Sequence, residues 1–110
     1  MVKIQRFDIC LVNLDPTVGS EIKKTRPVVI ISPDSMNKSR LKTIIAAPMT
    51  SSIRDNFPTR VKVCFKGKEG QIALEQLRAI DRSRIIKKLG SFEPEIGAKV
   101  LNIISIMFQP

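Results

Sequence analysis

The stretch RVKVCFK, residues 60–66, alternates polar and apolar side chains along its whole length. In an extended chain, one face would carry the apolar residues Val61, Val63 and Phe65, and the opposite face would carry two lysines and a cysteine. A period of two is typical of a strand that covers a core on one side and meets water on the other. The stretch therefore predicts a half-buried β-strand with a basic outer surface.

Four further apolar runs predict strands before and after this one. They are short, rich in β-branched residues, and mostly bounded by Pro, Asp or Gly. The runs are FDICLVNL at 7–14, RPVVIIS at 26–32, LKTIIAAPM at 41–49 and QIALEQL at 71–77. The segment GKEG at 67–70 is predicted to be the turn between the last two strands.

The pattern changes after residue 81, where the apolar spacing becomes helical. Residues 82–89 are predicted to form a short helical turn that stops at Gly90. Ser91 is predicted to cap a final helix, in which Gly97 costs about 1 kcal/mol relative to Ala and needs packing to hold it. The apolar stripe of this helix is Ile96, Val100, Ile103 or Ile104, and Met107.

Five short strands with little helix between them do not fit repeated βαβ units. The sequence predicts a mainly β fold with a C-terminal helix, built as a small, strongly curved or partly open antiparallel β-barrel. The helix is predicted to cover the apolar side of the barrel, and its stripe would also suit a dimer interface. The length of 110 residues predicts a single domain spanning residues 1–110.

Charge is the strongest compositional signal. The chain carries 19 Lys and Arg against 10 Asp and Glu, a formal net charge of +9 at pH 7, and both halves share the excess. The folded body itself is therefore basic, and it is predicted to attract polyanions, nucleic acid foremost. The alternative is a basic protein without such a partner, because net charge alone specifies little.

Absent residue types and motifs exclude several kinds of chemistry. The chain has no His, which removes the Ser-His-Asp triad and the His-paired nuclease site. Two cysteines without a CxxC pair do not make a zinc site, and no phosphate-binding glycine loop is present. We expect no metal and no cofactor. Without a secretory signal or an apolar run of about 20 residues, we expect a cytoplasmic protein with free thiols and no membrane partner.

The remaining candidates for chemistry are arginine, hydroxyl and carboxylate side chains. Arg26 stands where a polar loop enters an apolar run, and its planar guanidinium suits a bidentate contact with phosphate. The alternative for Arg26 is a solvated charge, paired with Glu21. Thr50, Ser51 and Ser52 end the third run and form either a phosphate-binding loop tip or an ordinary polar turn.

Further along the chain, Glu75 lies inside an apolar run, where a carboxylate needs a partner such as arginine. Three arginines follow it and form either a solvated face or part of a phosphate track. They are Arg78, Arg82 and Arg84.

Taken together, four segments resemble the MazF/PemK family of bacterial toxins: DPTVGSEIKKTRPVVIIS at 15–32, APMTSS at 47–52, FPTRVKV at 57–63 and ALEQLRAIDRSRI at 73–85. The match covers nearly the whole chain, in order. It implies an SH3-like or CcdB-like small β-barrel that works as a homodimer. It also implies sequence-selective, metal-independent cleavage of single-stranded RNA, usually mRNA, by a growth-arresting toxin that an antitoxin with an extended acidic segment inhibits.

The resemblance implies roles for particular positions. Arg26 and Thr50 would form the catalytic pair, the Gly-Ser-Glu turn would lie beside the scissile phosphate, and the Glu-Gln pair would line the RNA groove. Some members carry an arginine two positions before that Glu, where this chain has Ala73, so that subgroup's arrangement is not transferred. The residues expected to bind RNA or support the pair are Ser20, Glu21, Ser51, Glu75 and Gln76.

The expected reaction uses the 2′-OH of the RNA as nucleophile and leaves a 2′,3′-cyclic phosphate and a 5′-OH. Arg26 would stabilise charge on the phosphorane and protonate the leaving oxygen, because a guanidinium stays protonated and is a poor base. Thr50 would donate a hydrogen bond to a non-bridging oxygen. The 2′-OH proton would pass to Glu21, to Glu75 or to a phosphate oxygen.

Three other readings stay open at this point. One is a gyrase-poisoning toxin of the CcdB type, which would share the fold. The second is a barrel that binds RNA or DNA without cutting it, which five Phe and no Trp or Tyr make less favourable. The third is a remnant that has lost activity and only binds.

Overall fold

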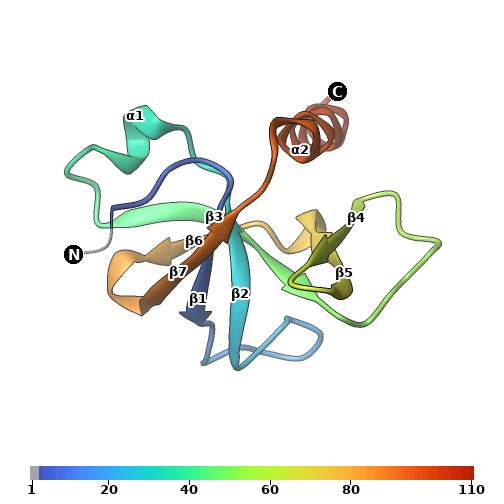
Figure 1. Ribbon diagram of the computed structural model, residues 1–110, viewed down its shortest axis with the longest axis horizontal. Coiled ribbons are helices and arrows are strands. Elements are labelled where there is room, and N and C mark those ends of the chain that lie inside the picture. Colours follow the sequence, from blue (N-terminus) through green and yellow to red (C-terminus); the bar gives the residue numbers. More distant parts are fainter. Residues whose placement is uncertain (1–2) are drawn as a thin grey trace.

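A computed structural model describes residues 3–110 as a curled sheet with one long helix (Figure 1). The helices are α1 (Asp34–Asn37) and α2 (Pro94–Met107), and two single-turn 3-10 helices, η1 (Leu74–Gln76) and η2 (Arg82–Arg84), flank β6. The strands are β1 (Asp8–Asn13), β2 (Thr25–Ile30), β3 (Thr43–Thr50), β4 (Arg60–Phe65), β5 (Lys68–Ala73), β6 (Arg78–Asp81) and β7 (Ile85–Ser91).

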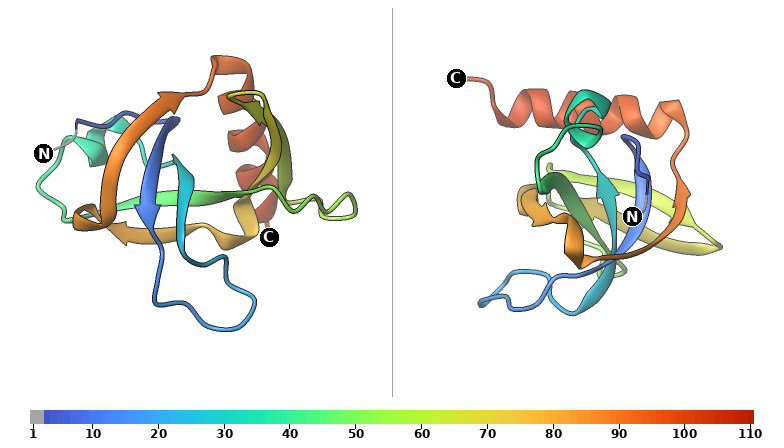
Figure 2. Two further views of the ribbon diagram at one scale, coloured as in Figure 1. Left: turned by 60° about the horizontal axis from the view of Figure 1, so that its bottom comes forward. Right: turned by 90° about the vertical axis from the view of Figure 1, so that its left-hand side faces the viewer.

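The strands form one antiparallel sheet in the order β4-β5-β3-β2-β1-β7, and β6 pairs with β3. The longest strand, β3, organises the sheet: its first four residues pair with β6 and its last two with β5. Figure 2 shows the sheet curling into an open half-barrel, with α2 lying across one end. The predicted mainly β fold with a C-terminal helix is confirmed.

The core confirms the sequence pattern on which the fold prediction rested. In β4, Val61 and Val63 are buried and Phe65 packs against the core, whereas the side chains between them face solvent. The apolar stripe of α2 packs on the same cluster, with Val100 fully buried at its centre. A helix that is apolar on one face gains most of its stability from this contact.

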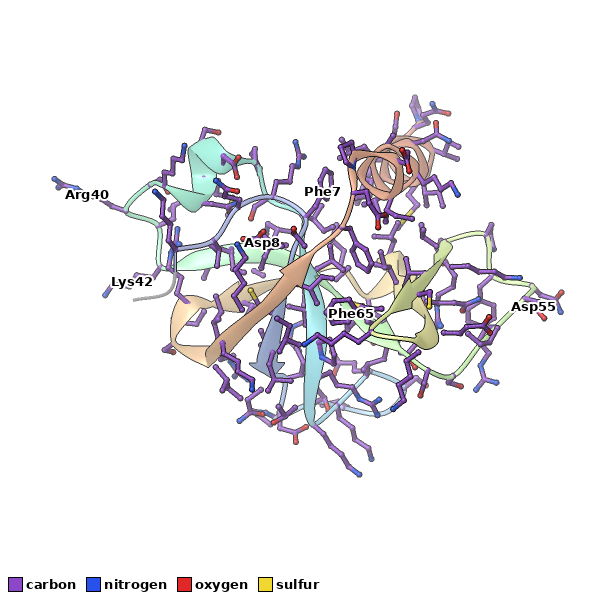
Figure 3. All side chains as sticks on the ribbon, viewed as in Figure 1. Phe7, Asp8, Arg40, Lys42, Asp55 and Phe65 are labelled. Carbon is purple, nitrogen blue, oxygen red and sulfur yellow. The ribbon has the colours of Figure 1, made fainter. Side chains whose placement is uncertain are left out.

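Gly97 lies where α2 packs closely against Phe7, the residue before β1. A Cβ atom at this position would be 2.4 Å from Cε2 of Phe7, far inside van der Waals contact. Phe7 lies beside the helix in Figure 3. The glycine therefore allows close packing that offsets its low helix propensity.

The end of the sheet differs from the sequence prediction. Residues 82–89 do not form a helical turn: only η2 is helical, and β7 follows it to Ser91. The pairing of β7 with β1 shifts register twice, and such bulges break the period of two that would have revealed a strand. The four-residue strand β6 was also missed, because it buries only Ile80 and shows no periodicity.

Two local predictions were wrong for conformational reasons. The turn between β4 and β5 is Lys66–Gly67, both with positive φ, and β5 already begins at Lys68. A lysine with positive φ is uncommon, so the sequence pointed instead to the following residues. Ser91 ends β7 and caps nothing, whereas α2 starts at Pro94, a residue favoured at the first helical position.

Both cysteines are free thiols, as expected from the sequence. Burial, with a contribution from the nearby Asp8 carboxylate, raises the pKa of the Cys10 thiol to about 11, and Cys64 is exposed. Within residues 3–110, no helix has both the length and the apolar character needed to cross a membrane.

Candidate functional site

Arg26 and Thr50 lie at the same edge of the sheet, on neighbouring strands. Arg26 is the second residue of β2, and Thr50 is the last residue of β3. The pairing of β2 with β3 runs from Ile30–Ala46 to Val28–Pro48, so Arg26 and Thr50 each lie two residues beyond its last pair, at the same edge of the sheet.

The two residues line one open pocket with a volume of about 160 Å³. Both are partly exposed, so solvent reaches them. The walls come from the start of β2, the end of β3 and the β4–β5 hairpin. The lining residues are Arg26, Pro27, Met49, Thr50, Ser51, Phe65, Lys68, Glu69 and Gly70.

The guanidinium of Arg26 is anchored at one nitrogen. Its Nε donates a hydrogen bond to the carbonyl of Lys23 at 3.1 Å, and its two terminal nitrogens make no hydrogen bond within residues 3–110. Arg26 and Glu21 do not pair: Glu21 instead accepts from the amide of Val18 at 2.6 Å. A guanidinium with free terminal nitrogens can bind two oxygens of a phosphate.

Thr50 is held through its side-chain oxygen, which accepts a hydrogen bond. The amide of Ser52 donates to Oγ1 of Thr50 at 3.1 Å, so the hydroxyl already has a donor and its own proton stays available. Gly70 of β5 packs against the backbone here, since a Cβ atom on it would lie 2.9 Å from the Thr50 carbonyl oxygen. The position of Thr50 therefore depends on the absence of a side chain at residue 70.

A second pocket, of about 200 Å³, collects other candidates from the sequence. Glu21, Glu75 and Gln76 line it together with Pro48. Since Pro48 and Thr50 are two residues apart on β3, the two pockets lie about 7 Å apart along this strand.

The side chain of Gln76 ties this second pocket to the β1–β2 loop. Its Oε1 accepts from the amide of Ile22 at 2.6 Å, and its Nε2 donates to the carbonyl of Ser20 at 3.4 Å. Ser20 is exposed and lines neither pocket. The structure therefore groups Ser20, Glu21, Glu75 and Gln76 at one place, and Arg26, Thr50 and Ser51 at the next.

Glu75 has the arginine partner that the sequence required. Its carboxylate lies 2.6 Å from Nη2 of Arg60 and accepts from the Thr59 hydroxyl at 2.8 Å. Partial burial alone would raise the pKa of Glu75, but the hydrogen bonds from Arg60 and Thr59 outweigh it and hold the pKa below its ordinary value. Arg60 in turn lies over the ring of Phe57, 5.1 Å from its centre.

A family model described as PemK-like, MazF-like toxin of type II toxin-antitoxin system matches residues 5–108. The chain belongs to this family. The family predicted from the sequence is thereby confirmed, and the match extends over both pockets.

Individual relatives agree with this assignment. The endoribonuclease MazF of Staphylococcus epidermidis is 39% identical over 107 residues, covering 94% of this chain and 89% of the relative. A crystal structure of MazF from Deinococcus radiodurans superposes with a TM-score of 0.83 at 23% identity and covers 97% of both chains. An endoribonuclease in complex with its cognate antitoxin from Mycobacterial species gives 0.77 at 16% identity, covering 100% of this chain and 98% of that one. These two structural likenesses support the fold alone.

The sequence did not point to every residue of the pocket in this PemK/MazF-family chain. Lys68 and Glu69 add a cation and a carboxylate to the lining, and Phe65 adds an apolar surface. Their position depends on how the β4–β5 hairpin folds over the end of β3. The nearest signal in the sequence is the GKEG segment, which predicts a turn and not a pocket wall.

Two of the three arginines after Glu75 contact the base of the β1–β2 loop. Arg78 donates to the carbonyl of Leu14 at 3.3 Å, and Arg84 donates to the carbonyls of Asn13 and Asp15. These contacts fasten β6 and η2 to the base of the β1–β2 loop. Neither arginine lines the Arg26–Thr50 pocket.

The Cys, Asp and Glu side chains are dispersed over the structure. Within the described range 3–110, no three of them come close enough together to hold an ion.

Proposed function

We propose that this chain is a sequence-selective, metal-independent endoribonuclease that cleaves single-stranded RNA, mRNA in particular, and arrests growth by blocking translation. Membership of the PemK-like, MazF-like toxin family supports this function over gyrase poisoning of the CcdB type. The name of the relative from Staphylococcus epidermidis, endoribonuclease MazF, supports it directly.

One observation carries the proposal: Arg26 and Thr50 line one open pocket, and each keeps hydrogen-bond donors free. Two nitrogens of Arg26 and the hydroxyl proton of Thr50 are available to a phosphate in that pocket. A barrel that only binds nucleic acid would not need such converging donors. Lys68 adds a second positive charge to the pocket.

In the proposed reaction, the 2′-oxygen of the RNA attacks the adjacent phosphorus and the bond to the 5′-oxygen breaks. The products are a 2′,3′-cyclic phosphate and a 5′-OH. Arg26 stabilises the charge that develops on the phosphorane and donates the proton that the 5′-oxygen takes up. Thr50 donates to a non-bridging oxygen and fixes the phosphate in line.

The 2′-OH must also lose a proton, and three carboxylates lie in or beside the pocket. Glu75 is engaged by Arg60 and Thr59, which makes it a weak base. Glu21 lines the neighbouring pocket rather than this one. Glu69 lines the same pocket as Arg26, so it is the best placed of the three, with a phosphate oxygen as the alternative acceptor.

The second pocket suits the nucleotides that flank the cut. Glu75, Gln76 and Glu21 offer acceptors and a donor that can read base edges, as the resemblance implies. Ser20 would act through the loop that Gln76 holds, and Ser51 through its place beside Thr50.

The proposed biological setting follows from the family. The chain would act as one domain spanning residues 1–110, as a homodimer in the cytoplasm. A cognate antitoxin would inhibit it with an extended acidic segment that competes with RNA for the basic groove. An antitoxin complex is known for the Mycobacterial relative, and that fact supports the partner proposed here.

The direct test is cleavage in the absence of divalent metal ions. Purified protein incubated with a long single-stranded RNA in EDTA is expected to cut at a few defined sequences, at the same rate as with Mg²⁺, because RNA supplies the nucleophile and Arg26 the positive charge. Primer extension maps the cuts. Activity that EDTA removes and Mg²⁺ restores would contradict metal independence. The absence of any cutting would contradict the proposed function and favour a protein that binds nucleic acid without cleaving it.

The contact between Gly70 and Thr50 gives a further prediction. Gly70→Ala is expected to slow RNA cleavage by about 10- to 100-fold, because the new Cβ must push the Thr50 backbone away from its position. Initial rates on a labelled RNA measure the effect, and thermal unfolding shows that the variant is folded. A folded variant with wild-type rates would mean that the placement of Thr50 does not matter for cleavage.

A further inference from the structure

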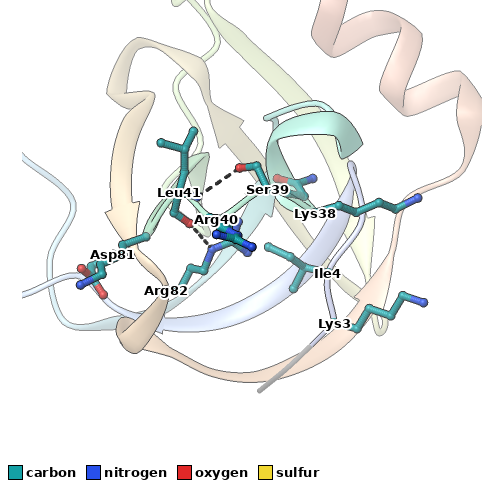
Figure 4. Close-up of a pocket in the computed structure, with 10 residues that line it drawn as sticks. Lys3, Ile4, Lys38, Ser39, Arg40, Leu41, Asp81 and Arg82 are labelled. Carbon is teal, nitrogen blue, oxygen red and sulfur yellow. Dashed lines mark hydrogen bonds between the residues drawn. The ribbon is translucent and has the colours of Figure 1, made fainter.

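A separate cationic cavity lies at the other end of β3. It has a volume of about 650 Å³, within the range of small-molecule binding sites. The N-terminal segment, the connection between α1 and β3, and the junction of β6 with η2 enclose it (Figure 4). None of its lining residues belongs to the two pockets described above.

Positive charge dominates this cavity. Its one carboxylate is Asp81, which accepts from the amide and hydroxyl of Ser83 at 2.9 and 2.7 Å. These hydrogen bonds lower the pKa of Asp81, so its carboxylate stays ionised and bound to Ser83 of η2. The cations around it are Lys3, Lys38, Arg40, Lys42 and Arg82.

Arg82 is held in place by the backbone around it. Its Nε donates to the carbonyl of Leu41 at 2.7 Å, and its Nη2 donates to the carbonyl of Met36 at 3.2 Å. The third nitrogen, Nη1, makes no hydrogen bond within residues 3–110. A guanidinium fixed in this way has little rotamer freedom left to lose when it binds an anion.

The loop that carries the other cations is also ordered by hydrogen bonds. The Ser39 hydroxyl donates to the Met36 carbonyl at 2.6 Å and accepts from the Leu41 amide at 3.2 Å, the latter shown in Figure 4. Asn37, 5% exposed, anchors α1 through its side-chain bond to the Ser32 carbonyl at 2.9 Å. The connection between α1 and β3, which lines the cavity, is therefore held in place by hydrogen bonds.

The cavity offers apolar surface as well as charge. Leu41 is 53% exposed beside the cations, and the buried side chain of Ile4 contributes to the lining. A nucleotide has the same two parts, since its base has an apolar face and its phosphate is an anion. An acidic peptide would use the charge but not the apolar surface.

We propose that this cavity is an exosite for single-stranded RNA, in which the cations bind backbone phosphates and Leu41 packs against a base. The inference rests on the proposed function and adds a contact remote from the cut. The eight residues of β3 separate the cavity from Thr50 by about 25 Å, so one RNA strand would meet both several nucleotides apart. Arg40 and Lys42 project at the edge of the molecule opposite the loop that carries Asp55, as Figure 3 shows.

The test compares two variants that lose the same charge. The first is Lys38→Gln/Arg40→Gln/Lys42→Gln, and the control is Lys62→Gln/Lys87→Gln/Lys99→Gln, with all six side chains exposed. The probe is a labelled 2′-O-methyl RNA of about thirty nucleotides, which lacks the nucleophile, so binding is measured without cutting. Fluorescence anisotropy gives the affinity as a function of salt, and thermal unfolding checks the fold.

We expect the first variant to bind about tenfold more weakly near 0.15 M salt and to lose about two from the slope of log affinity against log salt. We expect the control to change affinity by less than about twofold. Equal weakening by both variants, or no weakening by the first, would overturn the exosite. A second result would also overturn the exosite: wild-type protein binds ATP or polyglutamate, the first variant does not, and both bind RNA equally. The anion that the cavity binds would then be a free nucleotide or an acidic chain.

This comparison is independent of cleavage. If wild-type protein cuts RNA but the first variant binds it normally, the exosite fails and the proposed function stands. If wild-type protein cuts no RNA in the EDTA experiment, the proposed function fails, and the binding measurements still decide whether the cavity takes RNA phosphates.

Discussion

Replacing Arg26 with alanine is expected to lower RNA cleavage by about three orders of magnitude while the protein stays folded. The side chain makes one hydrogen bond, from Nε to the Lys23 carbonyl, and is partly exposed, so its removal leaves no buried group without a partner. The reaction, in contrast, would lose its main stabilisation of the phosphorane and its proton donor. Initial rates on a long single-stranded RNA measure the loss, and circular dichroism melting reports the fold.

Two matched variants sharpen this experiment. Arg26→Lys keeps the charge but loses the planar fork, so its rate is expected to fall between those of wild type and Arg26→Ala. Lys99→Ala removes one charge from the exposed face of α2 and is expected to cleave like wild type. An Arg26→Ala protein that stays within about tenfold of wild type would place the catalysis on other residues.

The strands that the sequence revealed share one physical property. Many side chains of β1, β2, β3 and β4 are buried, and these positions hold apolar residues. Each of these strands can therefore be recognised from its own local sequence. The stripe of α2 is readable for the same reason, since each of its apolar residues meets the core. Local pattern predicts an element when its burial is regular, on one face in β4 and α2 and along most of the strand in β1, β2 and β3.

The elements that escaped prediction lack such a pattern. β7 pairs with β1 through two register shifts, and its alternation is lost at each of them. β6 pairs with β3, and the neighbouring Arg78 and Arg82 side chains donate to carbonyls far away in the chain. These are tertiary contacts, which the local sequence of a four-residue strand does not predict. The type of turn at Lys66–Gly67 depends on the twist of the hairpin it closes.

The candidate site divides in the same way. Arg26 and Thr50 were found because they end apolar runs and belong to segments that resemble a family. Glu75 required an arginine, but only the folded hairpin shows that the partner is Arg60, 15 residues earlier in the chain. Lys68, Glu69 and Gly70 reach the pocket through the pairing of β5 with β3, which no local pattern of the sequence specifies.

An RNA with a single 2′-deoxy sugar at the cut is expected to resist cleavage completely at that position. The chain has no His, and Arg26 and Thr50 are suited to stabilise an attacked phosphate but not to generate a nucleophile. The proposed mechanism therefore takes the 2′-OH of the substrate as the attacking group. Gel analysis of an RNA labelled at one end, cut site by cut site, measures the effect.

The matched control for this substrate is the same RNA with the 2′-deoxy sugar moved to a position away from the cut, which is expected to be cleaved at an unchanged rate. Binding of the modified RNA should also be nearly unchanged, because the phosphates that meet Arg26 and Lys68 are all retained. Products identified by mass spectrometry should carry a 2′,3′-cyclic phosphate and a 5′-OH. Efficient cutting of the 2′-deoxy site would require water or a protein side chain as the nucleophile, and the roles given to Arg26 and Thr50 would then have to be reassigned.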